Sequence, residues 1–146
     1  MALTKIKCTE GFELGAYEAM PAGDAKGAVV VIQEIFGVNS HIRSVVDDYA
    51  AEGFYAIAPA IFDRLEHDVQ LDYSEASMTK GIELAFQQLD MTQTLSDLQA
   101  TIGPRVAPWQ SRRRRILLRW TAHLAIKLST GQRISCLCLL RWWHSR

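Results

Sequence analysis

The chain has 146 residues, of which 22% are charged, and its formal net charge is zero. The charges are unevenly distributed along the chain: residues 1–102 carry all 16 acidic side chains and 6 basic ones, whereas residues 103–146 carry 10 basic side chains and no acid. The three cysteines form no CxxC pair, and no segment reaches the roughly 18 apolar residues of a membrane span. We therefore expect a soluble, cytoplasmic protein that needs neither a metal ion nor another cofactor.

The first 32 residues predict strands. Residues 4–20 alternate loosely between apolar and polar side chains and contain two glycines, which is typical of an antiparallel hairpin. Residues 29–32, VVVI, form a short β-branched run that favours a strand buried on both faces. The polar pair Gln33 and Glu34 ends this run.

Residues 27–64 predict one strand, helix and strand unit. After Glu34, Asn39 and Ser40 are candidate caps for a helix that Gly53 ends, and the apolar segment 54–58 predicts a second strand. A crossover helix between two strands implies a parallel sheet, and α/β proteins place their sites on loops that leave the carboxyl ends of such strands. Glu34 is expected on such a loop.

Two further helices are predicted before residue 103. Asp72 or Ser74 is expected to cap the first, and after a break near Asp90 either Thr92 or Thr94 is expected to begin the second. Both helices have apolar residues at helical spacing: Met78, Ile82, Ala85, Phe86 and Leu89 in the first, and Leu95, Leu98 and Ile102 in the second.

The block QEIFG at residues 33–37 and the block APxxFDR at residues 58–64 resemble the opening half of the dienelactone hydrolase family, α/β-hydrolases also called carboxymethylenebutenolidases. The resemblance implies an α/β fold, the amino-terminal half of a parallel α/β-hydrolase sheet with covering helices. In that family the acid of QEIFG contacts a nucleophilic cysteine, and the amide of the next residue helps to form the oxyanion hole. The resemblance therefore implies catalytic roles for Glu34 and Ile35.

The family's reaction is hydrolysis of a lactone or enol ester, such as a dienelactone, through an acyl-cysteine. A histidine acts as base and an aspartate orients it. The implied partner is a small-molecule lactone or ester, and the oligomeric state stays open. The family carries its nucleophile in a GxCxGG elbow, which the chain does not contain. We therefore expect negligible activity from this polypeptide.

The segment 103–146 has the composition of a different sequence. It holds no acid and all four tryptophans, and we expect a boundary at residue 102 followed by an irregular or weakly helical tail. A frame change explains the tail. With one choice of synonymous codons, WQSRRRRILLRW at residues 109–120 becomes GKVGVVGFCYGG when read one base later, which places the nucleophile across the codons of Leu117 and Leu118. The same shift lets residues 136–144 encode VCAYYGGGI.

Other readings of the polar residues stay open. The arginines 112–115, with nearby tryptophans, could bind phosphates and stack on bases, and residues 115–128 could form a basic amphipathic helix at a membrane surface. The alternative function is thus a non-enzymatic half-domain whose tail binds nucleic acid or membrane nonspecifically. A third reading is a binding module made of residues 1–102. We expect Cys136 and Cys138 to be buried or incidental thiols. We expect His41 and His67 to be isolated surface or capping histidines, and His123 and His144 to have no role.

Overall fold

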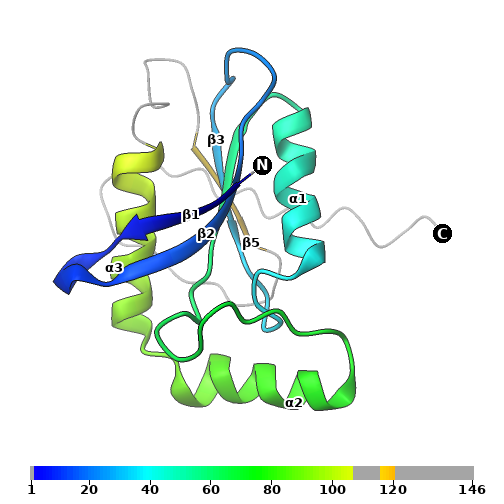
Figure 1. Cartoon of the computed structure of the whole chain (residues 1–146), viewed down its shortest axis with the longest axis vertical. Coiled ribbons are helices and arrows are strands. Elements are labelled where there is room, and N and C mark those ends of the chain that lie inside the picture. Colours follow the sequence, from blue (N-terminus) through cyan, green and yellow to red (C-terminus); the bar gives the residue numbers. More distant parts are fainter. Residues whose placement is uncertain (1, 107–115, 121–146) are drawn as a thin grey trace.

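The computed structural model describes residues 2–106 and 116–120, and these form a mixed five-stranded sheet with helices on both faces (Figure 1). The sheet order is β1-β2-β4-β3-β5. The strands are β1 (Ala2–Lys7), β2 (Glu13–Ala19), β3 (Ala28–Ile32), β4 (Tyr55–Pro59) and β5 (Ile116–Trp120). The helices are α1 (Ser40–Ala51), α2 (Glu75–Glu83) and α3 (Met91–Thr101), with a short 3₁₀ turn at Thr9–Gly11 and π-helical turns at Leu84–Gln88 and Ile102–Val106.

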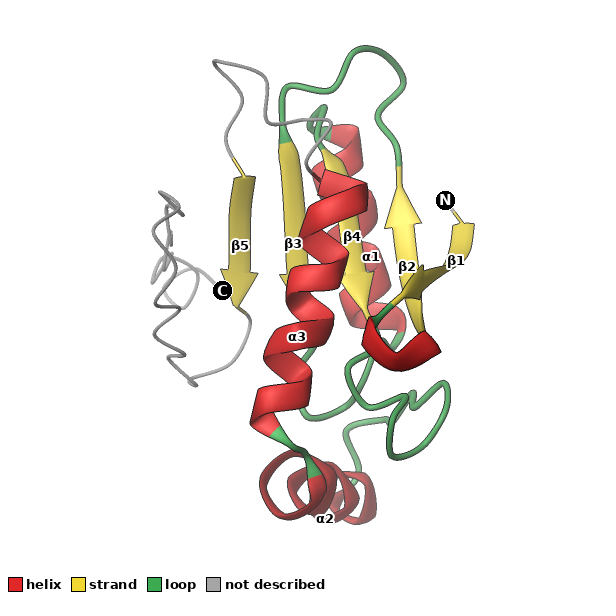
Figure 2. Ribbon diagram, turned by 90° about the vertical axis from the view of Figure 1, so that its left-hand side faces the viewer, coloured by secondary structure: helices red, strands yellow, loops and turns green. Residues whose placement is uncertain are grey.

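The strand directions confirm both predictions about the sheet. β1 and β2 form an antiparallel hairpin, and β2 also pairs antiparallel with β4. β3 lies between β4 and β5 and is parallel to both. Figure 2 shows that β3, β4 and β5 point toward the same edge of the sheet, which we call the carboxyl edge.

The core lies on both faces of β3, because its alternate residues point to opposite sides. Val29 and Val31 pack with α1 residues such as Ile42 and Val46 in one apolar cluster. Val30 and Ile32 belong to the other cluster, on the α3 side of the sheet, which also contains Leu14, Ile57, Leu98 and Val106. The continuous VVVI run is therefore buried on both faces, as predicted.

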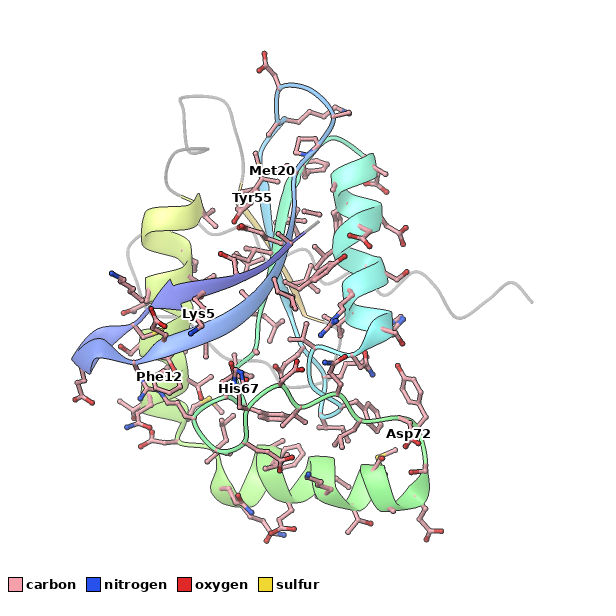
Figure 3. All side chains as sticks on the ribbon, viewed as in Figure 1. Lys5, Phe12, Met20, Tyr55, His67 and Asp72 are labelled. Atoms are coloured by element: carbon pink, nitrogen blue, oxygen red, sulfur yellow. The ribbon has the colours of Figure 1, made fainter. Side chains whose placement is uncertain are left out.

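The helix boundaries follow from capping side chains. The Asn39 side chain accepts a hydrogen bond from the Ile42 amide and begins α1, and the Ser74 hydroxyl caps α2 in the same way. Asp72 lies just before α2 (Figure 3), where bonds from the hydroxyls of Ser74 and Ser77 lower the pKa of Asp72 to about 2. The predicted N-caps of α3 were wrong: Asp90, not Thr92 or Thr94, accepts the free amides.

Two features of the fold bear on the site. α2 lies beyond the carboxyl edge of the sheet, across the ends of the parallel strands (Figure 2). β5 is a strand within the segment that we expected to be irregular or weakly helical. Residues 103–106 of that tail belong to the π-helical turn Ile102–Val106, and residues 107–115 and 121–146 lie outside the described residues. Within the described ranges no helix is long and apolar enough to cross a membrane.

Candidate active site at the carboxyl edge

The loop that leaves β3 is a tight turn built around Gly37. The Gly37 amide donates to the Glu34 carbonyl over 3.2 Å, and Gly37 has φ +78°, a left-handed conformation that favours glycine. A Cβ at this position would lie only 1.9 Å from the Val69 carbonyl oxygen. Residue 37 must therefore be a glycine, for its backbone conformation and for this contact.

The segment 69–71 holds the same loop from outside. The Leu71 amide donates to the Phe36 carbonyl over 2.9 Å, and the Asn39 side-chain amide donates to the Leu71 carbonyl over 3.2 Å. Asn39 thus caps α1 and ties the loop to the segment before α2. The turn and these bonds fix the backbone of residues 34–37 at the carboxyl edge.

Gln33 joins the ends of β3 and β4. Its side chain is 5% exposed, and its Oε1 atom accepts a hydrogen bond of 3.0 Å from the Ile61 amide. Its Nε2 atom is buried and has no hydrogen-bond partner in the part of the chain that the structure describes. A buried donor without an acceptor is costly.

Glu34 and Ile35, the two predicted catalytic residues, lie on this loop and are both half-buried. The Glu34 carboxylate makes no hydrogen bond or ion pair with the other described residues. Such a carboxylate is available to accept a proton or to orient a thiol, and a backbone amide such as that of Ile35 can donate to a developing oxyanion.

The structure brings no nucleophile to this loop. Cys8 is the cysteine among the described residues, and its thiol donates to the Ile6 carbonyl at 3.7 Å. Burial, with Asp97 nearby, raises the pKa of Cys8 to about 11, so the thiol stays protonated at neutral pH. Cys136 and Cys138 lie outside the described residues, as do His123 and His144.

The register of β5 also keeps its central residues away from Glu34. Leu117 and Leu118, whose codons could encode the shifted-frame cysteine, pair with Val29 and Val30 in the middle of β3. Val30 precedes Glu34 by four residues, which is roughly 13 Å of extended chain. Leu117 and Leu118, as described, therefore lie in a strand beside the middle of β3, at a distance from Glu34.

The loop after β4 contains a buried carboxylate with structural partners. One oxygen of Asp63 accepts the Gly15 amide over 2.8 Å, and the other accepts the Asp68 amide over 3.0 Å. A Cβ at Gly15 would meet Asp63 Oδ2 at 2.6 Å, so this contact also requires a glycine. Asp63 thereby joins the β4 loop to β2.

His67 is not isolated as we expected. Its Nδ1 atom lies 3.3 Å from Asp63 Oδ2, although the side chain is 77% exposed and lies in the loop between β4 and α2 (Figure 3). His41 is exposed on the first turn of α1, in agreement with the expectation of a surface histidine. The described residues contain no group of three side chains able to hold a metal ion.

Arg64 fixes α3 to the β4 loop. Its guanidinium donates two bonds to the Asp97 carboxylate, from Nε over 2.7 Å and from Nη2 over 2.9 Å, and it lies 4.4 Å from the centre of the Phe12 ring. The bond to Asp97 raises the pKa of Arg64, and Asp97 is 1% exposed. Sequence reasoning missed Asp97, because an aspartate within a helix has no local pattern that indicates a distant arginine.

Comparison with known sequences identifies a family that covers most of the chain. The sequence profile of the "Dienelactone hydrolase family" matches residues 14–115. A Synechocystis protein described as a "Putative carboxymethylenebutenolidase" is 41% identical over 95 residues, which are 64% of this chain and 38% of the relative. "Carboxymethylenebutenolidase 1" of Cupriavidus pinatubonensis is 31% identical over 67% of this chain and 42% of its own length. The chain thus spans about two fifths of these curated relatives.

Solved structures show the same fold. The crystal structure described as a "Putative Dienelactone Hydrolase" from Klebsiella pneumoniae superposes with a TM-score of 0.61 and 28% identity. The match covers 80% of this chain and 48% of that one. A dienelactone hydrolase-like phosphotriesterase from metagenomic libraries, 19% identical with a TM-score of 0.50, shares the fold alone. The α/β fold, the family profile and the relatives together show that this chain belongs to the dienelactone hydrolase family.

Proposed function

We propose that this chain is the amino-terminal part of an ester or lactone hydrolase in which Glu34 and Ile35 serve a cysteine nucleophile. One observation carries the proposal. The half-buried Glu34 carboxylate has no bonded partner among the described residues, on a loop that Gly37 and the segment 69–71 hold at the carboxyl edge. Parallel α/β sheets place their sites at this edge.

The reaction would follow acyl transfer through a thiol. A cysteine thiolate attacks the ester carbonyl carbon, and the Ile35 amide donates to the oxyanion that forms. The C–O bond breaks, the alkoxide or enolate leaves with a proton, and water then hydrolyses the acyl-cysteine. In the family a histidine moves these protons and an aspartate orients it, while Glu34 controls the charge and direction of the thiol. No step in this scheme requires a metal or a redox cofactor.

We also propose that the nucleophile is encoded in the shifted reading frame of residues 109–120. The chain as written contains no GxCxGG elbow. Cys8, the cysteine among the described residues, has a raised pKa and lies beside Asp97. The 146-residue chain then has only Glu34 and Ile35 of the catalytic groups, and its turnover is negligible. Of the residues that would carry the alternative, nucleic-acid or membrane binding, the arginines 112–115 lie outside the described residues, and Arg119 of the basic segment lies in strand β5.

Two genes test the proposal. The first encodes the chain as written, and the second lacks one base upstream of codon 109, so that the shifted frame is read from there onward. We expect hydrolysis of p-nitrophenyl acetate and of a dienelactone by the second product only. We expect Glu34→Gln to lower its kcat, and the matched change Glu52→Gln, at an exposed residue of the α1 end, to leave kcat unchanged. Turnover by the as-written chain that survives Glu34→Gln and is lost with Cys136→Ser or Cys138→Ser would overturn the proposal.

A further inference from the structure

α2 meets the candidate site at Gly81. Gly81 is the buried residue of α2, and it packs backbone to backbone against Ile35. A Cβ at position 81 would lie 2.4 Å from the Ile35 carbonyl oxygen and 3.1 Å from the carbonyl carbon. Real Cβ atoms do not approach backbone this closely, so a side chain at 81 would push the helix and residue 35 apart.

Helix propensity gives no reason for a glycine here. Gly81 is the seventh of the nine residues of α2, inside the helix, and its φ is not positive. Glycine is less favourable than alanine at such a position, because it loses more conformational freedom. The close approach to Ile35 is the physical reason for its presence.

The contact involves the residue whose amide we assign to the oxyanion hole. Ile35 is followed by the turn at Gly37, and Gly81 packs against it from α2. A Cβ at position 81 would also lie 3.3 Å from the Ile35 Cβ atom. Donors of an oxyanion hole act only when they lie about 2.7–3.1 Å from the place where the charge develops. A shift of a few tenths of an ångström at residue 35 is therefore large on this scale.

We propose that Gly81 is a positioning residue, through which α2 sets the direction of the Ile35 amide. The inference rests on the proposed catalytic role of Ile35 and goes beyond it, because it assigns Gly81 of α2, 46 residues later in the chain, to the same site. Gly81 itself touches no substrate. A methyl group at 81 moves the donor and not the substrate pocket, so kcat falls and KM changes little.

The first test uses the 146-residue chain and does not depend on activity. Gly81→Ala is compared with Gly23→Ala, which adds the same methyl group where no atom lies within 4 Å. In ¹H–¹⁵N spectra we expect Gly81→Ala to shift the Ile35 and Phe36 amides more than any others outside α2, and Gly23→Ala to leave both in place. Unchanged Ile35 and Phe36 amides in Gly81→Ala would overturn the inference.

The second test uses the frame-restored enzyme. We expect Gly81→Ala to lower kcat about tenfold or more, which is less than loss of a whole oxyanion donor, with KM within about twofold. Equal kcat in Gly81→Ala and Gly23→Ala would overturn the inference while leaving the proposed function intact. An inactive frame-restored wild type would instead contradict the proposed function, and the amide shifts of the first test would still decide the contact between Gly81 and Ile35.

A third variant tests the inference if Gly81→Ala does not fold. Ser74→Ala removes the N-cap of α2 and loosens the helix without adding an atom near Ile35. We expect a smaller fall in kcat, again at nearly constant KM. A rise in KM with unchanged kcat would contradict the positioning role.

Discussion

The loops that leave β3 and β4 both carry charged residues within blocks typical of the family, but they use these charges differently. In the β4 loop the Asp63 oxygens accept two backbone amides, and Arg64 is bound by both oxygens of Asp97. In the β3 loop the Glu34 carboxylate has no bonded partner among the described residues, while its backbone is held by neighbours. The comparison separates charges that hold the fold together from a charge left available for chemistry.

Breaking the Arg64–Asp97 pair should have the largest effect. Asp97→Ala leaves the mostly buried Arg64 guanidinium without its partner, and we expect the free energy of unfolding to fall by about 3 kcal/mol. Urea unfolding measures the change. Glu13→Ala removes the partner of Lys5 in an exposed pair and serves as control, with an expected loss well below that of Asp97→Ala. Equal losses in the two variants would contradict a structural role for the β4 loop.

Removing the Asp63 carboxylate should cost somewhat less. Asp63→Ala leaves the Gly15 and Asp68 amides without their acceptor, and we expect a loss of about 2 kcal/mol by urea unfolding. Asp63→Asn keeps one acceptor oxygen, so it should lose less than Asp63→Ala. If both variants were as stable as the wild type, the join between the β4 loop and β2 would not contribute to stability.

Cys8 offers a pH test of the same α3 contact region. Its pKa is raised from 9.0 to about 11 in the folded chain, mainly by burial and then by Asp97. Between these pH values the unfolded chain loses the thiol proton while the folded chain keeps it, so stability falls as pH rises. We expect the urea midpoint of the wild type to fall more between pH 9 and pH 11 than that of Cys8→Ala. Parallel curves would show that the thiol is not shielded.

Glu34 should give the smallest change in stability. Because its carboxylate has no bonded partner in the described ranges, Glu34→Gln should alter the free energy of unfolding by no more than about 0.5 kcal/mol. The same urea experiment measures it beside Asp63→Asn, a matched removal of one charge. A loss as large as that of Asp63→Asn would place Glu34 among the structural residues and remove the contrast between the two loops.

Local patterns predicted the elements that depend on local physics. The hairpin, the doubly buried VVVI strand and α1 follow from alternation, β-branching and an Asn cap, and each is present. The start of α3 was placed too late because Asp90, Thr92 and Thr94 all suit an N-cap, and the backbone alone decides which one accepts the free amides. Thus the type of each element was predictable where the spacing was clear, but the N-cap of α3 was not.

The contacts that distinguish the two loops were out of reach of the sequence. Asp63 and Gly15 lie 48 residues apart, and Arg64 and Asp97 lie 33 residues apart, so no local spacing connects them. The block FDR indicated the family and not the bonds that its residues make. Glu34 and Ile35 were found through QEIFG, whereas Gly81 had no signal beyond an unfavourable residue inside a helix.

The most direct test of the account is the base sequence of the coding region from codon 100 to codon 145. We predict that the frame one base later encodes GKVGVVGFCYGG across codons 109–120 and VCAYYGGGI across codons 136–144. That result would supply the cysteine that Glu34 and Ile35 lack. A shifted frame that encodes neither segment would contradict the account, and this chain would then be a family member without a nucleophile.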